Sequence, residues 1–199
     1  MSDIALSTRT AEVHRRTGET EVRVRLALDG TGGAEIATGV GFLDHMLTLF
    51  ARHGRFDLRV QATGDTDVDD HHTTEDVGIV LGQALREALG DKRGIARYGH
   101  AYVPMDEALV RSALDLSGRP FCVYQVPVQS AKVGTFDTEL VEHFCVSLAF
   151  NALLTLHVDL IRGRNTHHIL EAVFKSLALA LHTATRIVRD DLPSTKGTL

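Results

Sequence analysis

The chain has 199 residues, of which 44% are hydrophobic and 24% charged, a composition that predicts a globular protein able to bury a core. Its net charge is -5 without any basic block or stripe, which argues against nucleic acid as a partner. No apolar run is long enough to span a membrane and the N-terminus lacks a signal-peptide core, so we expect a cytoplasmic protein with no membrane partner.

The first half of the chain alternates strand signals with helix signals. Residues 19–30 alternate apolar and polar side chains and end in Asp-Gly, a turn signal, which predicts a strand. A short second strand is expected over 34–39. Residues 41–54 have the apolar spacing of a helix and end at a glycine, and 55–65 alternate again. Residues 71–90 carry one apolar stripe and predict a second helix.

The second half repeats this order of elements. The expected elements are strands over 106–118 and 120–128, a helix over 137–154, a strand over 154–163 and a helix over 167–188. Residues 91–105 are expected to connect the halves. We therefore predict an α/β (α+β) fold in which a strand-strand-helix-strand-helix unit is internally duplicated, with helices packed on sheets. The half-repeats would cover 1–92 and 93–199 and form one compact domain.

The motif His-His-x-x-Glu occurs once in each half, at the start of the second predicted helix. The two copies occupy residues 71–75 and 167–171. Each half also has an earlier histidine, His45 or His143, which follows an acidic residue in the first predicted helix. The spacing between this histidine and the following pair is nearly equal in the two halves. A repeat of both element order and histidine spacing indicates internal duplication.

These motifs have the spacing of metal ligands. Residues i and i+4 of a helix share one face, about 6 Å apart, so the first histidine and the glutamate of each motif can hold one ion. The second histidine points about 100° around the helix and is aimed at a different ion. If the halves face each other about a pseudo-twofold axis, two ions have four ligands each. One set is His71, Glu75, His143 and His168, and the other is His167, Glu171, His45 and His72.

The histidine pattern also has other interpretations, of which a solvated helix start is the simplest. A single His-His pair is usually a solvated helix start, but solvation gives no reason to repeat the spacing. Imidazole with one carboxylate suits manganese, iron, nickel or zinc, so the ligands alone do not choose the metal. A dinuclear metallohydrolase would use the same ligands and would release inorganic phosphate from a phosphate ester. A ferritin-like storage protein needs four long helices and Glu-x-x-His spacing, which this chain lacks.

Four segments carry a family resemblance: "GVGFLDHML", "DDHHTTEDVGIVLGQAL", "PMDEAL" and "NTHHILEAVFKSLALAL". They closely resemble imidazoleglycerol-phosphate dehydratase of the monofunctional type, and the resemblance runs over essentially the whole chain. It implies a fold like the second domain of ribosomal protein S5. It also implies a small-molecule phosphate substrate, dehydration of D-erythro-1-(imidazol-4-yl)glycerol 3-phosphate in histidine biosynthesis, and two Mn²⁺ ions per active site. The implied assembly is a homo-oligomer of 24 subunits built from trimers, with sites between subunits.

The same resemblance implies roles for further residues. Glu19 would reach a neighbouring subunit's substrate, and the substrate phosphate would be bound by Arg97, Arg119, Ser194, Thr195 and Lys196. Without the resemblance, these are ordinary surface charges and a frayed terminus. The candidate catalytic residues are Glu19, Asp106, Glu171, His45 and His72, and the sequence leaves the proton-abstracting base open between Asp106 and Glu171.

Overall fold

The computed structural model describes residues 9–197, which form two four-stranded sheets, four helices and a short hairpin. The first half contains β1 (Thr10–Arg16), β2 (Thr20–Ala27), β3 (Ala34–Ala37), α1 (Gly41–Gly54), β4 (Asp57–Gly64) and α2 (His71–Leu89). The second half contains β5 (Tyr98–Met105), β6 (Ala108–Asp115), β7 (Phe121–Gln125), β8 (Lys132–Val133), β9 (Phe136–Asp137), α3 (Leu140–Ala152), β10 (Thr155–Arg162) and α4 (Thr166–Thr185). Within this described part, no helix is long and apolar enough to cross a membrane.

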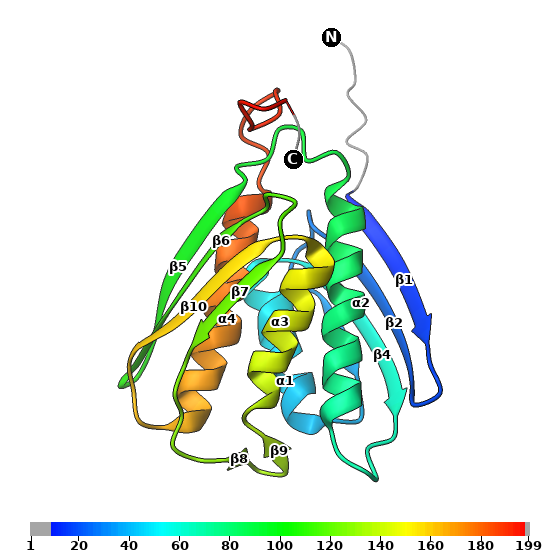
Figure 1. The fold of residues 1–199 in the computed structure, drawn as a ribbon, viewed down its shortest axis with the longest axis vertical. Helices are drawn as coiled ribbons and strands as arrows, with labels where there is room; N and C mark the ends of the chain where they lie inside the picture. Colours follow the sequence, from blue (N-terminus) through cyan, green and yellow to red (C-terminus); the bar gives the residue numbers. More distant parts are fainter. Residues whose placement is uncertain (1–8, 198–199) are drawn as a thin grey trace.

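The two sheets have the same topology. Their strand orders are β1-β2-β4-β3 and β5-β6-β10-β7. Figure 1 shows the two sheets on opposite sides of the molecule, with β1, β2 and β4 on the right and β5, β6, β7 and β10 on the left. In each sheet the first two strands form an antiparallel hairpin, the second pairs antiparallel with the last strand of its half, and that strand pairs in parallel with the third. The predicted α/β fold with an internally duplicated unit is therefore confirmed. The boundary predicted between residues 92 and 93 stays a prediction, and it falls in the loop between α2 and β5.

Each four-stranded sheet has one strand more than the sequence predicted, and the short β8–β9 hairpin was not predicted either. The first strand of each unit, β1 or β5, was missed, and residues 91–105 are therefore not merely a connection. Both strands lie at a sheet edge, where they leave most side chains at least partly exposed, so apolar alternation is weak. In β5 the pattern is further diluted by Gly99, whose position leaves no room for a side chain, because an added Cβ would lie 1.9 Å from the carbonyl oxygen of Ala180 in α4.

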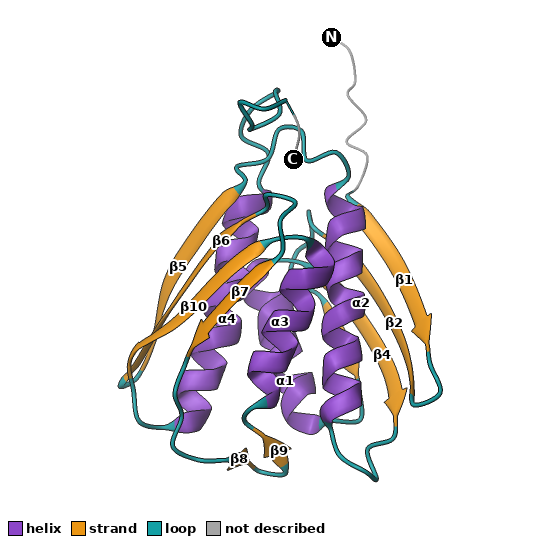
Figure 2. Ribbon diagram, viewed as in Figure 1, coloured by secondary structure: helices purple, strands orange, loops and turns teal. Residues whose placement is uncertain are grey.

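The helices lie between the two sheets (Figure 2) and join the halves. Helix α2 covers β1, β2 and β4, and α4 covers β5 and β6. The contacts between halves are made by cross-pairs of helices, because α2 packs along α3 and α1 packs along α4. Thus the first helix of each half contacts the second helix of the other half. This architecture excludes the long-helix bundle that a ferritin-like protein would require.

Two glycines of α2 face α3 and allow a close approach of the two helices. A Cβ added at Gly78 would lie 3.0 Å from the carbonyl oxygen of Phe144, and one added at Gly82 would lie 2.7 Å from that of Leu148. Phe144 itself is fully buried and stacks near Phe174 of α4, with ring centroids 5.1 Å apart. The helix layer therefore forms the centre of the core.

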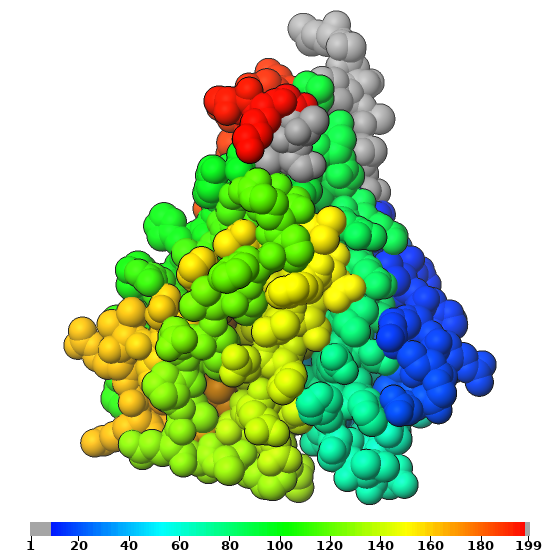
Figure 3. Space-filling model, in the orientation of Figure 1, coloured from blue at the N-terminus to red at the C-terminus, as the bar shows by residue number. Residues whose placement is uncertain are grey.

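The two ends of the molecule carry different elements. All four helices begin toward the end that carries the β8–β9 hairpin (Figure 1). The C-terminal segment lies at the opposite end, in red in Figure 3. There it is tied to the α2–β5 loop by backbone hydrogen bonds from Gly94 to Asp191 and from Val188 to Gly94.

Candidate active site

The N-terminal turns of the helices carry all six histidines of the repeated pattern. His45 lies in α1, His143 in α3, His71 and His72 open α2, and His167 and His168 lie in the first turn of α4. Local side chains start two of these helices. The side chain of Asn165 caps α4 by accepting from the backbone N–H of His168 at 3.3 Å, and Asp69 accepts from that of His71 at 2.8 Å.

One compact group of possible metal ligands forms where α1 meets α4. The ligand atoms of His45, His167 and Glu171 all lie within 4.8 Å of one another. The carboxylate of Glu171 is 3.1 Å from Nε2 of His167 and 3.5 Å from Nε2 of His45, and it also pairs with Lys175 at 2.5 Å. Burial opposes ionisation of Glu171, but these partners outweigh it and lower the pKa of the carboxyl group. The group is thus held as a carboxylate beside two imidazoles, a donor set that fits a divalent transition metal.

A second, looser group forms where α2 meets α3. The rings of His71 and His143 have centroids 4.6 Å apart. Glu75, one turn after His71, is half-buried, but no ion pair joins it to either ring among residues 9–197. Both groups therefore combine the first helix of one half with the second helix of the other, which is the arrangement that the pseudo-twofold scheme expects.

The second histidine of each pair lies apart from these groups. Nδ1 of His72 is 2.9 Å from Oδ2 of Asp65, and Nδ1 of His168 is 2.9 Å from Oε2 of Glu107. The hydrogen bond that the His72 ring donates to Asp65 is the main cause of the raised pKa of His72. The pKa of Glu107 is lowered to about 2, first by His168 and then by the backbone N–H groups of Asn165 and Arg164. Within one chain, His72 and His168 therefore do not complete the two ligand sets to which the sequence assigned them.

Two of the three acidic residues predicted to be catalytic, Glu19 and Asp106, lie beside these outlying histidines, in equivalent turns. Glu19 lies in the β1–β2 turn, with its carboxylate 3.7 Å from Nδ1 of His72. Asp106 lies in the β5–β6 turn, with its carboxylate 3.9 Å from Nε2 of His168. Their side chains are 60% and 80% exposed, so neither is committed to a buried partner.

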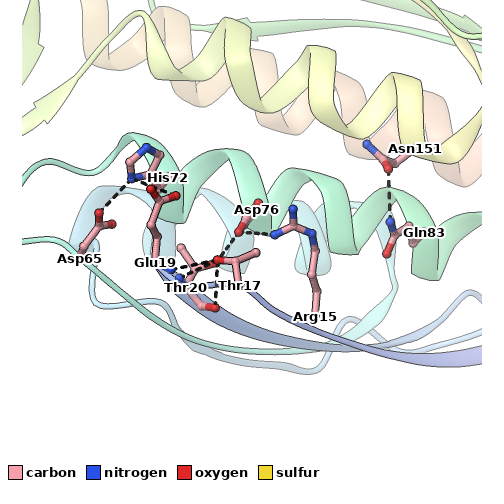
Figure 4. A network of polar contacts seen from close by, with 9 residues as sticks. All are labelled: Arg15, Thr17, Glu19, Thr20, Asp65, His72, Asp76, Gln83 and Asn151. Carbon is pink, nitrogen blue, oxygen red and sulfur yellow. Dashed lines mark hydrogen bonds and ion pairs between the residues drawn. The ribbon is translucent and has the colours of Figure 1, made fainter.

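The turn that carries Glu19 is anchored to α2 (Figure 4). Buried Asp76 accepts from Arg15 of β1 at 2.5 Å and from the hydroxyl of Thr20 of β2. Inside the turn, the hydroxyl of Thr17 accepts from the backbone N–H groups of Glu19 and Thr20 at 3.1 and 2.9 Å. Asp76 thus fixes the turn against the helix that begins with His71 and His72.

The residues predicted to bind phosphate lie together at the other end of the molecule, away from the histidines. Arg97 donates to both oxygens of Asp115, at 2.7 and 3.1 Å, and to the carbonyl oxygen of Pro193 at 2.8 Å. Arg119 approaches the same carboxylate at 3.7 Å and is mostly exposed. The tail continues from Pro193 into Ser194, Thr195 and Lys196, and the Lys196 N–H donates to the Ser194 hydroxyl at 3.2 Å. Two guanidinium groups and a turn of N–H donors suit a phosphate dianion.

These two sets of residues lie at opposite ends of α4. His167 is in its first turn, while the backbone of Arg97 is hydrogen-bonded to Ala184 near its last. The helix has 20 residues and so extends about 30 Å. A single chain therefore does not bring the metal groups and the phosphate residues to the same small molecule.

Several residues of this site were missed from the sequence: Asp65, Asp76, Glu107 and Asp115. Asp65 opens the acid-rich run that precedes the first histidine pair, and Glu107 follows Asp106 directly. Asp76 and Glu107 each directly follow a predicted site residue, whereas Asp65 and Asp115 lie further from one along the chain. Their partners depend on how loops and strands meet in three dimensions, which spacing along the chain does not specify.

Comparison with known proteins gives one consistent result. Residues 38–181 match the family model of imidazoleglycerol-phosphate dehydratase. The imidazoleglycerol-phosphate dehydratase of Granulibacter bethesdensis is 60% identical over 195 residues, which are 96% of this chain and 100% of that protein. The one from Halorhodospira halophila is 58% identical over 199 residues, 98% of this chain and 100% of that protein.

Solved structures agree with this result. A crystal structure of imidazoleglycerol-phosphate dehydratase from Staphylococcus aureus is 46% identical, with a TM-score of 0.82, and the match covers 90% of this chain and 99% of that one. A Pyrococcus furiosus structure of the same kind, in complex with (S)-C348, is 39% identical with a TM-score of 0.83, covering 94% and 100%.

Proposed function

The chain belongs to the imidazoleglycerol-phosphate dehydratase family, and from this premise we propose how its residues bind the substrate and move protons. The enzyme is a hydro-lyase of histidine biosynthesis. It dehydrates D-erythro-1-(imidazol-4-yl)glycerol 3-phosphate to 3-(imidazol-4-yl)-2-oxopropyl phosphate. Because this substrate is a charged phosphate ester, which does not cross membranes unaided, we place the reaction in the cytoplasm.

We propose that two Mn²⁺ ions serve each active site. The observation that carries this proposal is the convergence of His45, His167 and Glu171 from two helices onto one point. His71 and His143 form the matching start of a second ligand set. When bound, a divalent cation supplies Lewis acidity toward the imidazole ring of the substrate and orients it.

The active site is proposed to lie between subunits. His72 and His168 point away from the clusters of their own chain, and the phosphate residues lie about 30 Å from the metal ligands along α4. The three-carbon chain between the ring and the phosphate of the substrate is far shorter than that. If a neighbouring copy supplies one of the two sets of residues, the conflict is removed, and this supports an oligomer with sites between subunits. We propose the 24 subunits built from trimers that the family resemblance implies.

In this site the chain's own side chains bind the phosphate of the substrate and transfer protons. Arg97, Arg119 and the 194–196 tail hold the phosphate at a fixed distance from the ring. Glu171 is already paired with Lys175 and two histidines, so it is poorly suited to accept a proton from carbon. Glu19 and Asp106 are exposed carboxylates beside the outlying histidines, and we assign proton transfer to them.

The test is a product assay on metal-stripped enzyme, with and without added Mn²⁺. We expect formation of the 2-oxopropyl phosphate product only after Mn²⁺ is restored, without release of inorganic phosphate. His168→Ala is expected to lower both Mn²⁺ content and activity. Full activity with unchanged Mn²⁺ content in this variant would contradict the metal assignment, and phosphate release would favour a hydrolase.

A further inference from the structure

The two outlying histidines are held by carboxylates in the same way. In each case the ring atom is Nδ1, and the distance to the carboxylate oxygen is 2.9 Å, to Asp65 for His72 and to Glu107 for His168. An ionised carboxylate has no proton to donate, so each ring must donate its Nδ1–H. A neutral imidazole carries one N–H, and the free electron pair is therefore on Nε2.

The repetition of this contact is not inherited from the duplication. Asp65 lies in the loop after β4, shortly before its histidine in the sequence. Glu107 lies in the β5–β6 turn, which corresponds to the β1–β2 turn of the first half, and reaches His168 from a distant part of the chain. Two carboxylates from non-equivalent positions thus contact the same ring atom, Nδ1, of two equivalent histidines. This indicates that both rings need a hydrogen-bond acceptor at Nδ1.

Among residues 9–197, the side chain of Asp65 forms its hydrogen bond with His72. Its Oδ1 is buried and has no hydrogen-bond partner within residues 9–197, so its polar contact is made through Oδ2 to His72. A buried polar atom without a partner is costly and calls for an explanation. Glu107 differs, because its other oxygen also accepts from the backbone N–H groups of Arg164 and Asn165 before α4.

We infer that Asp65 and Glu107 are positioning residues for metal binding, which fix the Nδ1–H tautomer of His72 and His168 and so present Nε2 as the ligand atom. The inference rests on the proposed function, in which both histidines bind an ion. Carboxylates that hold the second nitrogen of a metal-ligating histidine typically change metal affinity 10- to 100-fold, which sets the scale of about 10- to 100-fold expected here.

The experiment measures the Mn²⁺ dissociation constant of the full chain, from the electron paramagnetic resonance signal of free Mn²⁺ at one protein concentration. Asp65→Asn and Glu107→Gln keep the shape of the side chain and remove its charge. Asp67→Asn and Glu139→Gln are controls for the same chemical changes, because both residues are exposed acids, in the loop before α2 and at the start of α3. Asp65→Glu and Glu107→Asp restore the carboxylate.

We expect about 10- to 100-fold weaker Mn²⁺ binding in the two amide variants, parental affinity in the controls, and partial recovery in the restored carboxylates. Thermal unfolding without metal distinguishes a purely structural role. A lower melting temperature with parental Mn²⁺ affinity in both amide variants would overturn the inference. Failure of the parent chain itself to bind Mn²⁺ would instead refute the proposed function and with it this inference.

Discussion

At the residue scale, Asp57 shows how one carboxylate can hold a turn. One of its oxygens accepts from the backbone N–H groups of Thr31 and Gly33, each at 2.9 Å, and from that of Gly32 at 3.2 Å. These bonds, led by that of Gly33, lower the pKa of Asp57. The turn between β2 and β3 therefore depends on an ionised side chain at the start of β4.

A pH-dependent stability change follows from this lowered pKa. Because the folded pKa lies below the unfolded value of about 3.9, the stabilisation is complete above that value and is lost as the pH falls through the folded pKa. We expect Asp57→Asn to lower the melting temperature by a few degrees at neutral pH. The difference from the parent should close below about pH 4. Glu12→Gln, an exposed control on β1, should show no such difference, and a gap that persists in acid would contradict the assignment.

Arg97 is the residue on which the phosphate assignment can be tested. Arg97→Ala removes a guanidinium held by Asp115 and Pro193, and we expect substrate binding to weaken by about 2–5 kcal/mol, the range for removing one partner of a buried charge pair. Mn²⁺ content should not change, since the metal ligands lie at the other end of α4. Arg93→Ala, at an exposed neighbouring position, is the control. Equal inhibition by inorganic phosphate in variant and parent would count against this role.

At the scale of elements, the α2–α3 contact depends on Gly82. Alanine is favoured over glycine inside a helix by about 1 kcal/mol, so a neutral site would gain stability from the exchange. Here the added Cβ would lie 2.7 Å from the Leu148 carbonyl oxygen and 3.0 Å from the Ala152 nitrogen, and backbone must move. We therefore expect Gly82→Ala to lower the melting temperature by several degrees. Gly41→Ala, where nothing lies within 4 Å of the added Cβ, should leave it unchanged or raise it.

The attachment of the β1–β2 hairpin to α2 can be tested through Asp76. Asp76→Asn weakens the hydrogen bonds to Arg15 and Thr20, and we expect a loss of about 2 kcal/mol of unfolding free energy. Because the turn carries Glu19, kcat should fall more than thermal stability alone explains at a temperature where the variant is folded. Glu21→Gln, which removes an exposed pair with His14, should have little effect on either quantity. An unchanged kcat in a stable Asp76→Asn enzyme would show that the turn does not need this anchor.

The sequence predicted the helices and central strands better than the edges. All four helices and the strands β2, β4, β6 and β10 bury alternate or periodic side chains, and this burial is what periodicity reports. The edge strands β1 and β5 lack that signal. In the site, the histidine spacing predicted which helices approach each other, but not the contacts of His72 and His168 with Asp65 and Glu107. Those contacts depend on loop paths that local sequence does not specify.

At the scale of the whole molecule, metal binding and assembly are expected to be linked. If His72 and His168 complete sites on neighbouring copies, each ion joins chains, and ligands that bind only the assembled state favour it by mass action. We expect chelation to convert the assembly into smaller units the size of trimers, while secondary structure is retained. Added Mn²⁺ should restore size and activity together.

Size-exclusion chromatography with light scattering, before and after chelation, measures this change. Circular dichroism of the same samples verifies that the subunits stay folded. A particle of unchanged mass after verified removal of Mn²⁺ would show that other contacts hold the assembly together.

The cross-pairing of helices, α1 with α4 and α2 with α3, also bears on how such a chain could arise. A half-length ancestor would have had one helical histidine and one His-His-x-x-Glu helix, and it could not have brought them together within itself. Two identical copies related by a twofold axis would have formed both ligand groups at once. Gene duplication and fusion would turn such a symmetric dimer into one polypeptide, whose two halves could then diverge, as the non-equivalent positions of Asp65 and Glu107 illustrate.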